Sequence, residues 1–149
     1  MLSLETIDYY SYLKGSRYYP VGGLGLIYPN TGNFIAIVGN IKSRKLVRDV
    51  VALFRRYAKF PSGAAALPEL LAGVSWSDHR AFWHEGYPGV MVTDIAPFRY
   101  PYYHTQEDTP DKIDYDRLAY VVSILEKVVA DIAGSREQEL IDIFENLIY

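Results

Sequence analysis

The sequence predicts an α/β protein, a layered sheet with helices on both of its faces. Short apolar runs typical of buried strands alternate along the chain with helix-length segments that carry an apolar stripe. The chain has 149 residues, and 50% of them are hydrophobic, which favours a folded domain over a disordered or fibrous chain. We therefore assign strands and helices in chain order.

The strands are predicted from the spacing of apolar residues. Residues 2–9 alternate between apolar and polar positions, whereas residues 34–39 and 89–93 are continuous apolar runs, typical of strands covered on both faces. A further short strand is expected around Leu70–Val74. The Gly/Pro/Asn-rich loop Gly15–Asn33 contains glycines that match no phosphate-binding fingerprint, so we do not expect phosphate binding there.

Two helices are predicted in the middle of the chain from capping residues that precede apolar stripes. Ser43 is a suitable N-cap for a helix that reaches about Tyr57. Ser77 or Asp78 can cap a shorter helix that ends near Glu85, before the break at residues 86–88. A long aromatic loop is expected over residues 95–113.

The C-terminal part is predicted as two helices. Asp114 caps a strong helix to about Ala133, and Gly134 is expected to end it. Ser135 then begins a last amphipathic helix. We therefore divide the chain into a domain over residues 1–134 and an additional C-terminal amphipathic helix over residues 135–149.

The composition excludes several classes of function. The formal net charge is −3 and no basic cluster is present, so a nucleic-acid or anionic-membrane partner is not expected. The absence of cysteine excludes disulfides, thiol nucleophiles and iron–sulfur clusters. No apolar stretch approaches the ~20 residues of a membrane helix, and the first residues lack a signal-peptide pattern. We expect a cytoplasmic protein as written, or an exported one if an N-terminal half precedes it.

Glu5 and the Ser77–His79 segment are polar residues in unusual places. By alternation Glu5 shares a strand face with Ser3 and Ile7, where a solvated carboxylate and a functional one are both open. Residues 77–79 are Ser-Asp-His, but successive residues on a helix point roughly 100° apart and cannot form a catalytic triad. A helix N-cap is the local alternative.

His104 lies in the aromatic loop between acidic and tyrosine residues. A loop histidine in such surroundings can act as a metal ligand or acid/base, or it can be an ordinary surface residue. The chain has 3 histidines in total, so a histidine-rich zinc site built from this chain alone is poorly supplied.

Taken together, these segments resemble peptidase family M28, the aminopeptidases that carry two zinc ions in an α/β domain. The resemblance is carried by SDHRAFW at 77–83, GYPGVMVTD at 86–94, FRYPYYHT at 98–105 and DTPDKIDY at 108–115. It extends over about residues 2–133. It implies the C-terminal half of a zinc-dependent aminopeptidase domain of the phosphorylase/hydrolase-like fold.

The resemblance assigns roles to several residues. Glu5 and His104 correspond to ligands of the two different zinc ions, and Tyr103 corresponds to a donor that stabilises the oxyanion of the tetrahedral intermediate. Asp78 corresponds to a carboxylate that orients the site by hydrogen bonding, with His79 beside it in a less defined role.

The aromatic loop is expected to form a wall for the N-terminal side chain of a peptide substrate. Its candidate substrate-binding residues are Phe98, Tyr100 and Tyr102. Aromatic loops also pack without binding anything, and that alternative remains open.

Part of the family's machinery has no counterpart in these 149 residues. The family's His-x-Asp pair and Glu-Glu pair, which supply the bridging aspartate and the general base, occur nowhere in the sequence. We therefore expect weak zinc binding by the chain alone. We also expect a complementary N-terminal half, a homo-oligomer, or coverage of the open sheet edge by residues 135–149.

Three functions follow from this comparison. The first is a zinc-dependent aminopeptidase that hydrolyses N-terminal peptide bonds with metal-activated water, incomplete as this chain alone. The second is a non-catalytic, truncated relative that acts as an interaction or structural module. The third is a glutaminyl cyclase-like acyltransferase, because those enzymes resemble the same peptidases and use one zinc ion.

Overall fold

The computed structural model describes residues 1–18 and 30–148, and for residues 135–148 it describes the backbone alone. The described strands are β1 (Leu2–Glu5), β2 (Ile35–Asn40), β3 (Ser62–Leu67) and β4 (Val90–Thr93). The described helices are α1 (Arg44–Tyr57), α2 (His79–His84) and α3 (Tyr115–Ile148), with short 3-10 turns η2 (Ala96–Phe98) and η3 (Pro110–Lys112).

The four strands form one mixed sheet in the order β1-β4-β2-β3. β1 is parallel to β4 and β2 is parallel to β3, whereas β2 and β4 are antiparallel. The carboxyl ends of β1 and β4 therefore lie at the same end of the sheet as the amino ends of β2 and β3. Both β1 and β3 are edge strands.

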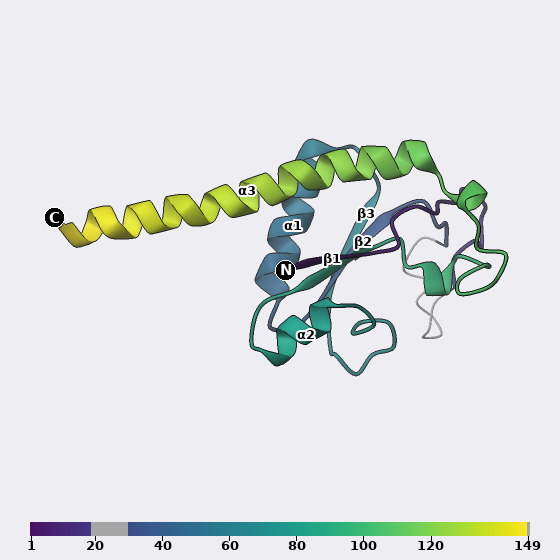
Figure 1. The fold of residues 1–149 in the computed structure, drawn as a ribbon, viewed down its shortest axis with the longest axis horizontal. Helices are drawn as coiled ribbons and strands as arrows, with labels where there is room; N and C mark the ends of the chain where they lie inside the picture. Colours follow the sequence, from purple (N-terminus) through teal and green to yellow (C-terminus); the bar gives the residue numbers. More distant parts are fainter. Residues whose placement is uncertain (19–29, 149) are drawn as a thin grey trace.

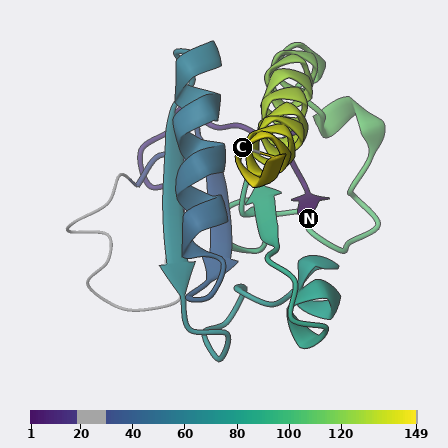
Figure 2. The ribbon, with the colours of Figure 1, turned by 90° about the vertical axis from the view of Figure 1, so that its left-hand side faces the viewer.

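Helices cover both faces of this sheet, as predicted. α1 and α3 lie over one face, and α2 lies across the sheet from them (Figure 1, Figure 2). The division follows the strand alternation, since Ile35 and Ile37 of β2 join the core beneath α1 and α3 while Ala36 and Val38 join the cluster that contains Trp83 of α2. The fold class expected from the sequence is confirmed.

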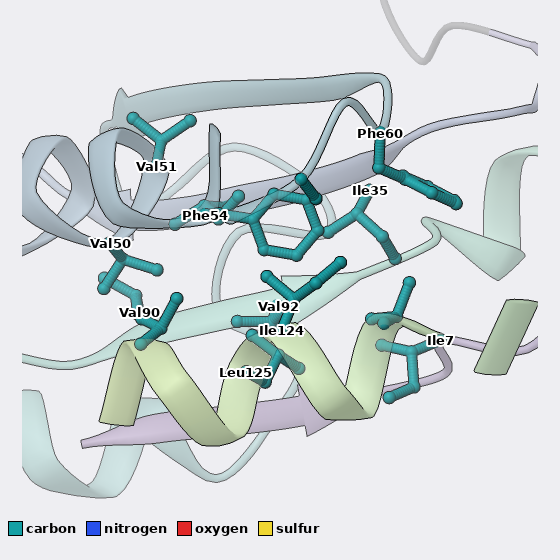
Figure 3. Close-up of a cluster of buried hydrophobic side chains, with 14 of the residues drawn as sticks. Ile7, Ile35, Val50, Val51, Phe54, Phe60, Val90, Val92, Ile124 and Leu125 are labelled. Carbon is teal, nitrogen blue, oxygen red and sulfur yellow. The ribbon is translucent and has the colours of Figure 1, made fainter. Parts of the chain in front are cut away.

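The larger core lies between the sheet and the pair α1 and α3 (Figure 3). Phe54 of α1 is fully buried there against residues of β2, β4 and α3. The residues labelled in Figure 3 are Ile7, Ile35, Val50, Val51, Phe54, Phe60, Val90, Val92, Ile124 and Leu125. Apolar burial at these positions supplies the main driving force for the fold.

The first strand is shorter than the predicted residues 2–9. β1 ends at Glu5 because Thr6 adopts a left-handed conformation with φ 47°, which breaks the extended backbone. Ile7 consequently joins the core under α1 and α3, whereas the hydroxyl of Ser3 lies 2.7 Å from that of Ser77 beside α2. The prediction that Ile7 shares a face with Ser3 and Glu5 is wrong for this reason.

The weak strand predicted around Leu70–Val74 is also wrong. That segment is a pair of turns, closed by hydrogen bonds from the amide of Leu71 to the carbonyl of Pro68 and from the amide of Val74 to the carbonyl of Leu71. The strand lies earlier, in β3, whose Ser-Gly-Ala-Ala-Ala-Leu sequence has low intrinsic β propensity. Parallel pairing with β2 along its whole length overrides that propensity.

The C-terminal residues form one helix where two were predicted. α3 continues from Tyr115 to Ile148 and passes through Gly134 without a break. A glycine inside a helix costs only about 1 kcal/mol relative to alanine, and no proline follows to stop the helix. The C-terminal part of α3 runs past α1 and away from the sheet (Figure 1). That residues 135–149 are an addition to the domain over residues 1–134 stays a prediction.

Most of the predicted loop Gly15–Asn33, including its Gly22–Gly25 segment, lies outside the described residues. The other predicted strands and helices agree with β2, α1, α2 and β4 to within one or two residues at most ends. Within the described residues, no helix combines the length and the apolar character needed to cross a membrane.

Replacement of Phe54 by alanine should lower the free energy of unfolding by about 3–5 kcal/mol, because a fully buried ring leaves a cavity between α1, α3 and the sheet. Chemical denaturation followed by circular dichroism measures this loss. Phe82→Ala is the matched control, since Phe82 is 41% exposed and should lose much less. Equal losses in the two variants would contradict the assigned core.

Candidate functional site

Two chain segments that carry candidate residues, the end of β1 and the loop after β4, start from the same end of the sheet. Glu5 is the last residue of β1, and its register partner is Thr93 at the end of β4. Thr93 in turn pairs with Ala36 near the start of β2. The loop that follows β4 contains Tyr103 and His104. Strand order and direction thus bring Glu5 to the end of the sheet from which the loop with Tyr103 and His104 departs.

Glu5 ends β1 and is paired in register with Thr93, the last residue of β4. Its carboxylate is half-buried, and it forms no hydrogen bond or ion pair with any residue that the structure describes. Burial lowers the pKa of His79, and the negative charge of Glu5 opposes that shift. Burial raises the pKa of Tyr103, and the charge of Glu5 adds to that shift. Glu5 is therefore a carboxylate available for a ligand.

Tyr103 and His104 form an adjacent pair in the loop after β4. Their ring centroids are 4.0 Å apart, and His104 is exposed with a left-handed backbone at φ 59°. Burial raises the pKa of Tyr103, and the charges of Glu5 and Asp94 raise it further. The Tyr103 hydroxyl thus remains protonated at neutral and moderately alkaline pH, where it can donate a hydrogen bond.

Asp94 is the buried carboxylate at this end of the sheet, and sequence reasoning had assigned it no role. Its side chain is fully buried and accepts hydrogen bonds from the Thr6 hydroxyl and from the amides of Asp8 and Tyr9, at 2.9, 3.1 and 3.0 Å. Nη2 of Arg99 lies 3.8 Å from its Oδ1. Asp94 therefore joins the ends of β1 and β4.

Arg99, also missed from the sequence, extends this connection to β2. Its side chain is fully buried, its Nη1 donates to the carbonyl of Phe34 at 3.0 Å, and its guanidinium lies over the Phe34 and Tyr10 rings. Burial lowers the pKa of Arg99 to about 10. Because this value is still well above 7, Arg99 remains a cation at neutral pH. An aspartate directly after an apolar strand and an arginine in the following loop were the available sequence signals.

The Asp78–His79 pair divides into an exposed residue and a buried one. His79 is fully buried, its Nε2 lies 2.7 Å from the carbonyl of Val74, and its Nδ1 has no hydrogen-bond partner among the described residues. Asp78 is the exposed N-cap residue of α2 without a side-chain capping bond. The described part of the chain shows no hydrogen bond from Asp78 to Glu5 or His104, so its orienting role stays a prediction.

The predicted aromatic wall consists of two separate groups. The ring of Phe98 stacks on that of Trp76 at 6.3 Å, and Trp76 lines an open cavity of about 730 Å³ beside Asp78. Tyr100 instead packs on Tyr9 and Tyr102, with centroid distances of 4.7 and 5.7 Å. The substrate-binding assignment of Phe98, Tyr100 and Tyr102 stays a prediction, and Trp76 is an additional aromatic near the site.

The described residues do not complete a metal site. No group of three or more histidine, cysteine, aspartate or glutamate side chains within residues 1–18 and 30–134 is arranged to hold a metal ion. Glu5 and His104 have suitable donor atoms, an oxygen and an imidazole nitrogen, but a tetrahedral zinc centre needs four ligands. This chain can contribute ligands to such a centre without forming it.

The comparison with known proteins identifies the class. The model of "Peptidase family M28" matches residues 27–129, and the chain belongs to this family of peptidases. This match confirms the family resemblance drawn from the motifs.

The chain is also similar to a particular bacterial protein. It is 36% identical over 122 residues to the "Uncharacterized protein YfbL" of Escherichia coli strain K12, a match that covers 82% of this chain. The chain spans only 38% of the length of that relative. No solved structure gives a significant match.

The free energy of unfolding should fall as the pH is lowered below about 6.5, the ordinary histidine pKa. Burial lowers the pKa of His79, so between the two pKa values the unfolded chain binds a proton that the native chain does not. Denaturation midpoints between pH 7 and 5 measure this. His79→Gln should reduce the dependence of the denaturation midpoint on pH. His84→Gln, at an exposed position, is the control and should leave that dependence unchanged. An equal dependence on pH in the unmodified chain and both variants would contradict the assignment of this effect to His79.

Proposed function

We propose that this chain supplies one side of the active site of a zinc-dependent aminopeptidase of the M28 type. The observation that carries the proposal is that Glu5 pairs in register with Thr93, the last residue of β4, and that the loop after β4 carries the packed pair Tyr103 and His104. Family membership supports peptide-bond hydrolysis as the reaction. The preference for the N-terminal bond and the dependence on zinc are part of the proposal.

In this proposal the remaining metal ligands and the general base come from a complementary segment. The described residues offer no group of three ligands, and neither a His-x-Asp nor a Glu-Glu pair occurs in the sequence. A base within hydrogen-bond reach of the attacking water is required for hydrolysis. Glu5 and His104 are the ligands that this chain would contribute, one to each of two zinc ions.

Tyr103 is proposed to stabilise the transition state. Peptide hydrolysis places negative charge on the carbonyl oxygen, and a preorganised donor at that position lowers the barrier. The hydroxyl of Tyr103 is suited to this role because burial and the charges of Glu5 and Asp94 favour its protonated form. The Tyr103 side chain is half-buried.

The complementary segment is proposed to pair with the open edge of β1. Among the strands that the structure describes, β1 pairs with β4 alone, and its own Leu4 is 53% exposed. Val122 and Val129, about two helical turns apart on α3, are 47% and 51% exposed. A strand paired with β1 and a helix packed on these valines would cover this surface, and the greater length of the bacterial relative supports such a segment.

The chain alone should bind zinc weakly and should not hydrolyse aminoacyl p-nitroanilides. Isothermal titration calorimetry with zinc measures the first property, and absorbance of released p-nitroaniline measures the second. A submicromolar zinc site that is lost in His104→Ala would contradict the proposal that the metal site needs a second segment.

A chimera tests the positive claim. This chain replaces its 122-residue match inside the full-length Escherichia coli relative, and the chimera should hydrolyse leucine p-nitroanilide in a zinc-dependent reaction. Tyr103→Phe should lower kcat by about 100-fold or more, since it removes one oxyanion donor. Tyr87→Phe, at a position 64% exposed, is the matched control and should retain activity.

The unmodified relative is assayed in parallel. An active relative with an inactive but folded chimera would contradict the assignment of peptidase function to this chain. An active chimera that is insensitive to both Glu5→Gln and His104→Ala would contradict the proposed ligands.

A further inference from the structure

Glu5 stands at the least constrained point of its strand. β1 has four residues, pairs with β4 on one side only, and ends at Glu5. The last residue of a short edge strand is free to fray unless the following residues are held. The contacts that hold residues 6–9 therefore determine where the Glu5 carboxylate lies.

The first of these contacts is made through Thr6. Its φ of 47° is unfavourable for a β-branched residue, so the surrounding structure must maintain it. The Thr6 hydroxyl lies 2.7 Å from the carbonyl oxygen of Glu5 and 2.9 Å from Oδ1 of Asp94. The amide of Asp94 donates back to the carbonyl of Thr6 at 2.8 Å.

The second oxygen of Asp94 holds the next two residues. Its Oδ2 accepts the amides of Asp8 at 3.1 Å and Tyr9 at 3.0 Å. Both side-chain oxygens of Asp94 are thus used on the segment that follows Glu5, and the side chain is fully buried. Arg99 balances the buried charge from the side of the loop that leads to Tyr103.

We propose that Asp94 is a positioning residue of the peptidase site, which holds Glu5 at the end of β1 by binding Thr6 and the amides of Asp8 and Tyr9. Asp94 does not touch substrate in this assignment. The relevance of Glu5 to peptide hydrolysis rests on the proposed function, whereas the positioning itself is a property of the chain alone.

The test compares the effect of Glu5→Gln in two backgrounds. In the otherwise unmodified chain, Glu5→Gln should shift the ring resonances of Tyr103 and the neighbouring amides in NMR spectra at neutral pH, because the Glu5 charge reaches that ring. In the Asp94→Asn background the same substitution should produce no shift at Tyr103, because Glu5 is no longer held there. Neither zinc nor substrate is present, so the result is independent of whether the chimera is active.

Controls separate positioning from stability. Unchanged amide spectra of α1 and β3 show that the variant is folded, and Asp49→Asn, which removes the exposed partner of Lys45, should leave the Glu5→Gln shifts intact. Undiminished shifts at Tyr103 in folded Asp94→Asn would overturn the proposal. A merely stabilising carboxylate would alter the denaturation midpoint and preserve those shifts.

A milder pair of variants decides the question if Asp94→Asn does not fold. Thr6→Val removes the hydroxyl that bonds Asp94, and Thr6→Ser keeps it. Loss of the Glu5→Gln shifts at Tyr103 in Thr6→Val, with their recovery in Thr6→Ser, supports the proposal. Equal shifts in both variants overturn it.

Discussion

The burial of one carboxylate organises this end of the molecule. Removing the Asp94 charge from water costs several kcal/mol, and that cost is acceptable only where hydrogen bonds and a counter-charge replace the solvent. The backbone after β1 supplies two amides, Thr6 supplies a hydroxyl, and Arg99 supplies the cation. Because these partners come from segments about 90 residues apart, the requirement of a single side chain imposes the relative placement of β1 and the loop after β4.

The sequence predicted the elements whose signal is local. Continuous apolar runs identified β2 and β4, and capped apolar stripes identified α1, α2 and the start of α3. The errors have non-local causes: β3 forms from alanines because β2 offers its whole length for pairing, and the turn at Thr6 depends on a carboxylate far along the chain. At Gly134 the stop signal was weak, since glycine lowers helix stability without preventing a helix.

The candidate site likewise contains residues that a local motif identifies and residues whose role depends on distant parts of the chain. Motif resemblance proposed Glu5, Tyr103 and His104, and the fold pairs Glu5 with the end of β4, the strand that leads into the loop with Tyr103 and His104. Asp94 and Arg99 stood within the quoted motifs and at positions that gave a signal, but a buried ion pair leaves no periodic pattern, so their pairing was recognised from the structure. Asp78 and His79 are neighbours in sequence with opposite exposure, which helix geometry decides once the orientation of α2 on the sheet is known.

The unbroken length of α3 has a hydrodynamic consequence. At about 1.5 Å per residue, its 34 residues extend roughly 50 Å, and the helix continues beyond the sheet that it covers. A molecule of 17.0 kDa with such a projecting rod tumbles anisotropically and experiences more friction than a sphere of equal mass. Its elution volume in size-exclusion chromatography will therefore suggest a larger particle than a monomer, and only a mass measurement such as light scattering will distinguish shape from self-association.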